Sequence, residues 1–302
     1  MKLGVSLTSA HPGALPADGA RTIIDRARAA RDADLDSLSL GDHHSTPFPY
    51  YQAVPMIGRL TAEWGSDRPI GCLFLLPLWN PVLVAEMVGT LACLTDEPFI
   101  VQTGIGSGAG QFAAMGADPS RRGADLDESI RVIQALLAGD TVSSERFGFR
   151  DAVVNPRPPH EVDWWIGAGS PGPLDRAARL GQAWYAGPDV TPDTGPALLE
   201  LYHDACRHHA RVPRAVVRKD VIVLRDGARA RRLGDDLVAA GYRGLPRAAV
   251  VCGGVDEVVE ELLPYRQLGF EQVVVRTMAG ITQGEALETL ELCGAVREHL
   301  AR

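Results

Sequence analysis

The stretch LGVSLTSAHPGALPADGARTIIDRARAARDADLDSLSL, residues 3–40, sets the pattern for the whole chain. Its first five residues are a short apolar run typical of a buried strand. Residues 18–33 then carry alanine and isoleucine at helical spacing, with arginine and aspartate between them. Residues 36–40 form a second short run of strand type. The stretch therefore predicts a strand, a helix and a second strand, which is one β/α unit of a parallel sheet.

The same alternation continues along the chain. Further strands are predicted at residues 70–75, 99–103, 163–166, 183–186, 216–224 and 271–276, and further helices at 52–64, 82–94, 120–138, 172–180, 196–210, 228–240, 256–268 and 285–300. Residues 141–159 break the rhythm with an irregular or hairpin excursion. Eight strands alternating with helices predict a (β/α)8 TIM barrel with insertions in its βα loops, formed by a single domain, residues 1–302. A doubly wound open sheet is the competing architecture.

Composition and charge narrow the class of protein. The 302 residues include 38 Asp and Glu against 30 Lys and Arg, a net charge of −8, which argues against nucleic acid or an anionic membrane as the main partner. No apolar run reaches the roughly 18 residues of a membrane helix. The five cysteines are widely spaced and odd in number, so we expect neither a disulfide framework nor a metal site, and we expect a cytoplasmic protein. A small-molecule substrate is the expected partner.

In a barrel of parallel strands, the functional residues lie in the loops after the carboxyl ends of the strands. This rule selects His11, the run Asp42-His43-His44, Pro77–Asn80, Gly104–Gln111, Ala168–Pro171, Gly187 and Arg276–Met278. An imidazole donates a proton near neutral pH, and an adjacent carboxylate fixes its tautomer. The run Asp42-His43-His44 is therefore a candidate for proton transfer, with a structural histidine as the alternative interpretation.

Two small-residue loops are candidates for binding a cofactor. GIGSGAG, residues 104–110, contains G-x-G-x-x-A, but it lies in the fourth β/α unit and no strong helix is predicted to open directly after it. We interpret Gly104, Gly106, Ser107 and Gly108 as a loop whose missing side chains let a flat ring or its tail lie against the backbone, rather than as a simple tight turn.

The second small-residue loop precedes a predicted helix. In IGAGSPGPLDRAARLG, residues 166–181, backbone N–H groups at the helix N-terminus and the Ser170 hydroxyl predict a phosphate site that includes Gly169. Arg176 on the same helix is a possible clamp for the phosphate, and a solvated surface arginine is the alternative.

Four segments together resemble one known family. They are LGDHHSTPF (40–48), LPLWNPVLVAEMVGTL (76–91), FIVQTGIGSGAGQFAAMGADPSRRGADLDESIRVIQALLAG (99–139) and WIGAGSPGPLDRAARLGQAWYAG (165–187). They resemble the bacterial luciferase-like oxidoreductases, which are TIM barrels that use reduced FMN or the deazaflavin F420. The resemblance also implies a homodimer.

The resemblance gives the candidate residues their roles. Asp42 and His43 would be catalytic residues beside the flavin or deazaflavin ring. The segment Leu75–Leu78, with Leu75 and Leu76 as cofactor-binding residues, would pass beneath the ring. Asn80 and the loop Gly104–Gly108 would lie at its edge, and Gly169 and Ser170 would hold the phosphate. Residues at the barrel mouth set substrate specificity, and we assign this role to His11, His44, Tyr50 and Trp79.

Two positions depart from the family pattern. Ala109 stands where the resemblance to F420-dependent sugar-phosphate dehydrogenases implies a proton-transferring glutamate, and Gln111 stands where many family members have a glutamate. The acid usually found in this loop is absent. We therefore do not expect an alcohol dehydrogenation driven by glutamate.

Two chemistries remain from the sequence. The first choice is an FMNH2-dependent monooxygenase that uses O2 to oxidise a small apolar or aromatic substrate, with a separate flavin reductase supplying the reduced flavin; the apolar loops FLLPLW and TPFPYY suit a dry cavity. The alternative is an F420H2-dependent reductase that passes a hydride to a C=C or C=N bond, with His43 supplying the proton. A third possibility is a barrel that binds flavin without turnover.

Overall fold

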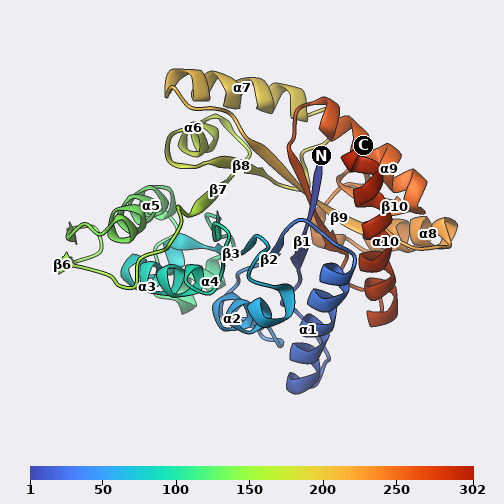
Figure 1. Cartoon of the computed structure of the whole chain (residues 1–302), viewed down its shortest axis with the longest axis horizontal. Helices are drawn as coiled ribbons and strands as arrows, with labels where there is room; N and C mark the ends of the chain where they lie inside the picture. The colour runs from blue at the N-terminus through green and yellow to red at the C-terminus, as the bar shows by residue number, and fades with distance from the viewer.

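A closed ring of eight parallel strands forms the centre of the computed structural model, which describes residues 1–302 (Figure 1). Around the ring the order is β1 (Lys2–Leu7), β2 (Leu38–Leu40), β3 (Ile70–Phe74), β4 (Ile100–Thr103), β7 (Asp163–Ala168), β8 (Ala183–Ala186), β9 (Ala215–Val223) and β11 (Gln272–Thr277). β8 pairs with β9, and β11 pairs with both β9 and β1, so the ring has no free edge. The predicted (β/α)8 barrel is confirmed, and the open sheet is excluded.

Helices cover the outside of the ring (Figure 1). They are α1 (Pro16–Asp32), α2 (Ala53–Trp64), α3 (Pro81–Ala92), α4 (Ala109–Ala114), α5 (Arg122–Ala138), α6 (Pro171–Leu180), α7 (Gly195–His208), α8 (Gly227–Ala239), α9 (Val255–Gln267) and α10 (Gln283–Ala301), with short 3-10 turns η1 (Leu76–Leu78), η2 (Tyr242–Gly244) and η3 (Arg247–Ala249). Most predicted boundaries agree with these within two residues.

Four elements, β5, β6, α4 and β10, lie outside the simple alternation. The excursion after α5 is the antiparallel hairpin β5 (Val142–Ser144) and β6 (Phe149–Ala152). Of the two predicted forms, irregular or hairpin, the structure shows the hairpin. The sequence analysis missed α4 and the ninth strand β10 (Val250–Gly253). β9 has nine residues and β8 only four, so the carboxyl half of β9 extends beyond β8, and β10 pairs with it there. This pairing follows from the length of β9, which periodicity alone does not reveal.

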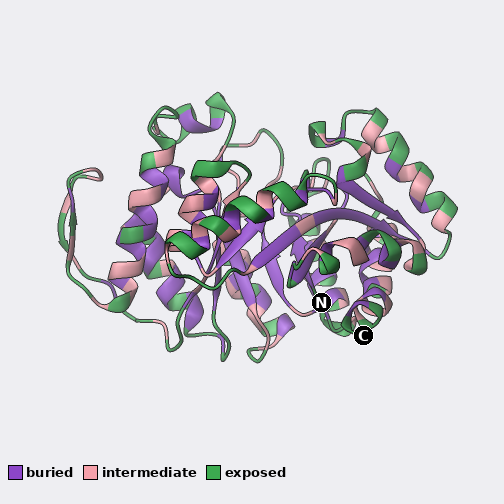
Figure 2. Ribbon diagram, turned by 90° about the horizontal axis from the view of Figure 1, so that it is seen from above, coloured by how far each residue is buried: buried purple, intermediate pink, exposed green.

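Alternate residues of each strand face the helices or the barrel interior. The outward residues join one core of 58 buried side chains, which appears as the purple strands and inner helix faces of Figure 2. The inward residues form a separate apolar cluster: Ile100, Trp165, Ala183, Tyr185, Val216 and Val274. A Cβ at Gly4 would lie 2.1 Å from Ser37 Oγ and 2.3 Å from Gln272 Nε2, so a larger residue would force these side chains to move. The barrel centre is therefore packed rather than open.

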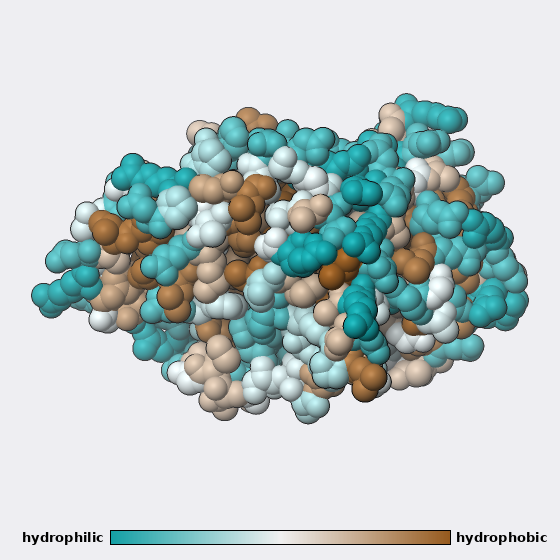
Figure 3. Space-filling view, turned by 60° about the horizontal axis from the view of Figure 1, so that its bottom comes forward, coloured by the Kyte–Doolittle hydropathy of each residue, from teal (hydrophilic) through white to brown (hydrophobic).

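The outer surface is mixed in polarity. The face in Figure 3 carries small, separate hydrophobic patches among hydrophilic side chains. No helix combines the length and the apolar character that crossing a membrane requires. All five cysteines are unpaired, as expected from their spacing.

Candidate active site

The loop after β2 is held in place by a buried carboxylate, Asp42. Its side chain is 1% exposed. The Oδ2 atom accepts hydrogen bonds from the backbone N–H of Leu75 at 2.9 Å and from the indole of Trp79 at 2.8 Å. It also lies 3.2 Å from the Nε2 atom of His44. Asp42 therefore joins the β2–α2 loop to the β3–α3 loop and acts as a positioning residue.

The two adjacent histidines differ in environment. His44 is buried, contacts Asp42 and packs edge-on against Trp79 with ring centroids 5.0 Å apart. The sequence analysis expected the Asp42 carboxylate to orient a proton-transfer histidine. In the structure this carboxylate contacts His44, the residue assigned to substrate binding. The His43 ring has no hydrogen bond within the protein and is half-buried beside Tyr50, at a centroid distance of 5.8 Å.

The environment of His43 favours its neutral form. Burial lowers the pKa of His43, and nearby Asp42 opposes this shift only in part. Burial also raises the pKa of the neighbouring Tyr50 to about 12. His43 is therefore the side chain of this loop that is free to exchange a proton with a ligand near neutral pH.

The glycine-rich loop after β4 is tied to the β2–α2 loop by Gln111. The side-chain oxygen of Gln111 accepts from the backbone N–H of His44 at 2.8 Å, and its amide donates to the Ser107 carbonyl at 3.0 Å. Gly108 has a φ of +87° and directly precedes α4. A short helix of six residues, α4, begins at Ala109 inside this run and was not predicted, whereas the next long helix, α5, begins only at Arg122. Gln111 has a structural role here in place of the acid expected at this position.

The residues predicted beneath and beside the ring differ in their accessibility. Leu75 and Leu78 pack with Phe112 in a small cluster below the glycine-rich loop. Leu76 is completely buried in the main core, so its side chain is not available to a ligand. Asn80 is exposed, and its side chain accepts from the Val82 N–H to cap α3. Of this group, Leu75 and Leu78 lie nearest to the glycine-rich loop.

The predicted phosphate site at the start of α6 is only partly as expected. Gly169 and Ser170 are exposed, and the Ser170 side chain makes no cap hydrogen bond. However, positions 171 and 173 are prolines, so the first turn of α6 offers few free N–H groups. Arg176 forms an ion pair with Asp127 and donates to the Gly123 carbonyl. The guanidinium is thus bound to α5 rather than directed at the loop Gly169–Ser170, and its role as a clamp stays a prediction.

A charged cluster inside the barrel was largely missed by the sequence analysis. Asp220 is completely buried and lies 3.3 Å from Arg218 and 2.8 Å from Arg243. Tyr242 donates to the same carboxylate at 2.8 Å. Burial opposes ionisation of Asp220, but Arg218, Arg276 and Arg243 outweigh it and lower its pKa. Three arginines around one carboxylate give this cluster an excess of positive charge.

The signal for this cluster was present in the sequence. Arg218 and Asp220 stand two residues apart in the otherwise apolar strand AVVRKDVIV, so both face the same side of the sheet. On the neighbouring strand β11, Arg276 pairs in register with Asp220. The sequence analysis selected Arg276 only because it lies at the end of a strand. Charges at alternate positions of a barrel strand indicate a polar interior layer.

The remaining predicted residue, His11, lies after β1. Its backbone N–H donates to the Pro49 carbonyl at 3.0 Å, which joins the β1–α1 loop to the loop that carries Tyr50. Its Nε2 atom is buried without a partner. His11 therefore belongs to the same end of the barrel as His43.

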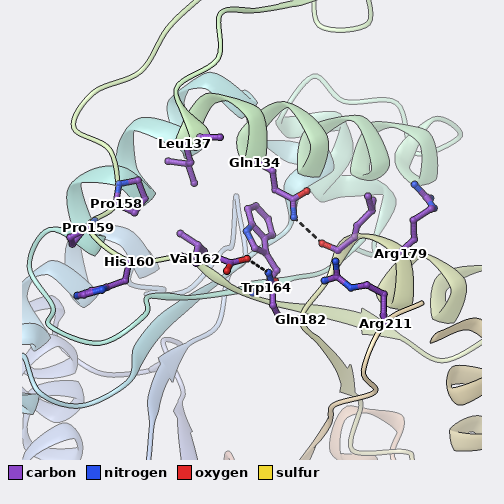
Figure 4. Close-up of a pocket in the computed structure, with 13 residues that line it drawn as sticks. Gln134, Leu137, Pro158, Pro159, His160, Val162, Trp164, Arg179, Gln182 and Arg211 are labelled. Atoms are coloured by element: carbon purple, nitrogen blue, oxygen red, sulfur yellow. Dashed lines mark hydrogen bonds between the residues drawn. The ribbon is translucent and has the colours of Figure 1, made fainter. Parts of the chain in front are cut away.

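A pocket of about 500 Å³ lies at the opposite end of the barrel (Figure 4). Its walls are the carboxyl ends of α5 and α6 and the segments that precede β7 and β8. Its polar side chains are largely engaged, since Gln134 donates to the Leu180 carbonyl and Arg211 to the Gly181 carbonyl. None of the predicted site residues lines it, and TIM-barrel active sites lie at the carboxyl ends of the strands.

The sequence model of the luciferase-like monooxygenases matches residues 1–247. The chain therefore belongs to the luciferase-like monooxygenase family of flavin- and F420-dependent oxidoreductases.

Curated relatives with a named cofactor lie within this family. The chain is 27% identical over 209 residues to the F420-dependent glucose-6-phosphate dehydrogenase of Kineococcus radiotolerans, covering 64% of this chain and 62% of the relative. It is 32% identical over 168 residues to the enzyme of the same name from Beutenbergia cavernae, covering 51% and 49%. The chain thus spans about half to two thirds of the length of these relatives.

Solved structures share the fold along almost the whole chain. A monooxygenase from Streptomyces bottropensis superposes with a TM-score of 0.83 at 19% identity, covering 100% of this chain and 99% of that one. An F420-dependent secondary alcohol dehydrogenase, solved with an F420-acetone adduct, has a TM-score of 0.79 at 17% identity, covering 98% and 100%. At these identities the likeness concerns the fold alone.

Proposed function

We propose that the protein is an F420-dependent oxidoreductase that exchanges a hydride and a proton with a small organic substrate. The observation that carries this proposal is the cofactor of the curated relatives, which match 64% and 51% of the chain. The likeness to monooxygenases that use FMN is one of fold only. The proposal therefore reverses the order of preference that the sequence suggested.

The backbone of both small-residue loops at the barrel mouth is accessible to a ligand. A Cβ added at Gly108, Gly110, Gly169 or Gly172 would have no atom within 4 Å, so open space lies over both small-residue loops. The backbone of the glycine-rich loop would lie beside the ring, and Gly169 and Ser170 would donate hydrogen bonds to the phosphate. When bound, F420 would carry the hydride.

The charge at the barrel mouth supports an anionic ligand. The overall charge of −8 gives no sign of a basic groove. Locally, however, Arg218, Arg243 and Arg276 outnumber their single counter-ion, Asp220. F420 carries a phosphate and a carboxylate tail, so a positive mouth in a negatively charged protein favours its approach.

His43 is the residue proposed to move the proton. Burial keeps it neutral near pH 7, so its free ring nitrogen can accept the hydroxyl proton of an alcohol while the substrate carbon loses a hydride and becomes a carbonyl. In the reverse direction, protonated His43 returns the proton as an unsaturated bond gains the hydride. Ala109 and Gln111 carry no ionisable group, so neither replaces His43 in this role.

A cofactor titration tests the proposal. Purified protein is titrated with F420, FMN and FMNH2 in turn, and the dissociation constants are determined from fluorescence. We expect F420 to bind most tightly, and hydride exchange to proceed without O2. Tighter binding of FMNH2 together with O2 consumption would establish the monooxygenase instead, and binding of none of the three would overturn the proposal.

A further inference from the structure

One buried arginine lacks a counter-ion. Arg26 on α1 is 6% exposed and is the only buried arginine of the chain. No carboxylate lies within 4.0 Å of its guanidinium, in contrast to the many arginines that form ion pairs on the surface. Its Nε donates to the side-chain oxygen of Gln283 at 2.8 Å, and its Nη1 lies 3.5 Å from the hydroxyl of Thr277. The remaining N–H groups of the guanidinium have no acceptor in the protein.

An unpaired buried charge is costly to the folded state. Buried charged groups in proteins are normally paired or hydrogen-bonded throughout. Burial lowers the pKa of Arg26 to about 10, and no neighbouring carboxylate opposes that shift. The guanidinium still remains charged at pH 7, so the fold holds a cation whose natural partner is missing from the chain itself.

Arg26 lines a cavity of about 330 Å³. The cavity lies between the β1–α1 loop, which contributes Thr8 and His11, and the β11–α10 loop, which contributes Met278 and Gly280. It is therefore at the carboxyl ends of β1 and β11, beside the barrel mouth. Half of its lining residues are hydrophobic.

No acidic residue lines this cavity. The buried Nε2 atom of His11, which lines it, has no hydrogen-bond partner. Burial and the neighbouring Arg26 lower the pKa of His11, and a hydrogen bond to the Thr8 backbone opposes this shift only in part, so the ring is neutral near pH 7. Arg276 reaches the edge of the cavity, where it donates to the Thr8 hydroxyl at 3.3 Å.

We propose that this cavity is a binding site for an oxyanion, a carboxylate or phosphate group, that pairs with Arg26 beside the ring of His11. The planar fork of a guanidinium matches two oxygens of such a group. On the ring, β1 is diametrically opposite β7, so the site lies across the mouth from Gly169 and Ser170. The oxyanion is either a free anion or the charged end of the substrate. Only the second assignment rests on the proposed function.

Binding to the protein without cofactor tests the site itself. Inorganic phosphate and acetate are titrated by calorimetry into wild type and into Arg26→Met, with sodium chloride at matched ionic strength as the salt control. Arg21→Met is the matched control, because Arg21 is on the same helix but is exposed and paired with Asp18. We expect wild type and Arg21→Met to bind at least one oxyanion, and Arg26→Met to bind it at least tenfold more weakly.

The stability of the variant provides a second measurement. Arg26→Met removes a largely buried charge but also leaves Gln283 Oε1 without its donor, so the melting temperature of each protein without anion serves as its own reference. The added anion should raise the melting temperature of wild type but not that of the variant. Equal affinity in wild type and Arg26→Met, or no binding of either anion to wild type, would overturn the proposal.

Steady-state kinetics distinguishes the two sources of the oxyanion. If the substrate supplies it, Arg26→Met raises KM for an anionic substrate such as glucose 6-phosphate at least tenfold, with little change for a neutral alcohol, and phosphate inhibits competitively. If phosphate binds through Arg26 but leaves KM unchanged, the site takes a free anion. If F420 does not bind but phosphate does, the proposed function fails and the oxyanion site stands.

Discussion

Replacing Asp42 with asparagine tests how the mouth of the barrel is held together. The carboxylate Oδ2 lies within 2.8–3.2 Å of donors on Leu75, Trp79 and His44. Asparagine keeps the shape and one acceptor oxygen but loses the negative charge. A hydrogen bond to a charged group is worth about 1 kcal/mol more than one between neutral groups, so the three contacts together predict a loss of about 2 to 3 kcal/mol.

This loss converts into a measurable change in melting temperature. With about 2.1 cal/mol/K of unfolding entropy per residue, a chain of 302 residues should melt about 3 to 5 °C lower. Scanning calorimetry of wild type and Asp42→Asn measures this difference. Asp25→Asn is the control, since Asp25 is exposed and lies 3.5 Å from Arg28; it should change stability by at most about 0.5 kcal/mol. Equal melting temperatures of wild type and Asp42→Asn would refute the reasoning.

Four further predictions concern the proton-transfer residue, the phosphate loop and the barrel interior. His43→Ala should lower kcat by roughly 10²- to 10⁴-fold and leave the cofactor dissociation constant unchanged, as measured by stopped-flow and fluorescence; an unchanged kcat would remove His43 from the mechanism. Ser170→Ala should weaken cofactor binding by about 1 to 1.5 kcal/mol through loss of one hydroxyl, and an unaltered dissociation constant would place the phosphate elsewhere. Gly4→Ala should lower the free energy of unfolding in urea by about 1 to 3 kcal/mol, because its Cβ would lie 2.1 Å from Ser37 Oγ, and an unchanged value would contradict tight packing of the barrel interior. Since burial lowers the folded-state pKa of His43 below 6.5, its contribution to stability is present above pH 6.5 and is lost as pH falls; wild type should therefore lose more stability than His43→Gln between about pH 7 and 5, and parallel losses would contradict this.

Much of the fold could be predicted from the chain because each β/α unit has its own local pattern. The strand at Lys2–Leu7 and the helix at Pro16–Asp32 follow directly from a short apolar run and from helical spacing. β10 was missed because it is only four residues long, and its place depends on the extra length of β9. A strand whose partner is available only after the barrel has closed leaves little trace in periodicity.

The sequence predicted where the candidate site residues lie more accurately than it predicted what each side chain contacts. The rule that loops follow strand ends correctly grouped His11, the histidine pair and the glycine-rich run. It could not decide which histidine contacts Asp42, because adjacent residues in a loop differ in direction only once the loop is packed. It also could not identify Arg26, which is in the middle of a helix like any surface arginine.

The sequence by itself determined the alternating architecture, the family and the set of loops that form the mouth, because these depend on local periodicity and on residue types at strand ends. Only the tertiary structure decided the electrostatics of the mouth. It places Arg218, Asp220 and Arg276 on neighbouring strands of the barrel interior and leaves Arg26 buried without a carboxylate. Charge pairing depends on distances of a few ångströms between residues far apart in the chain, and those distances exist only in the folded barrel.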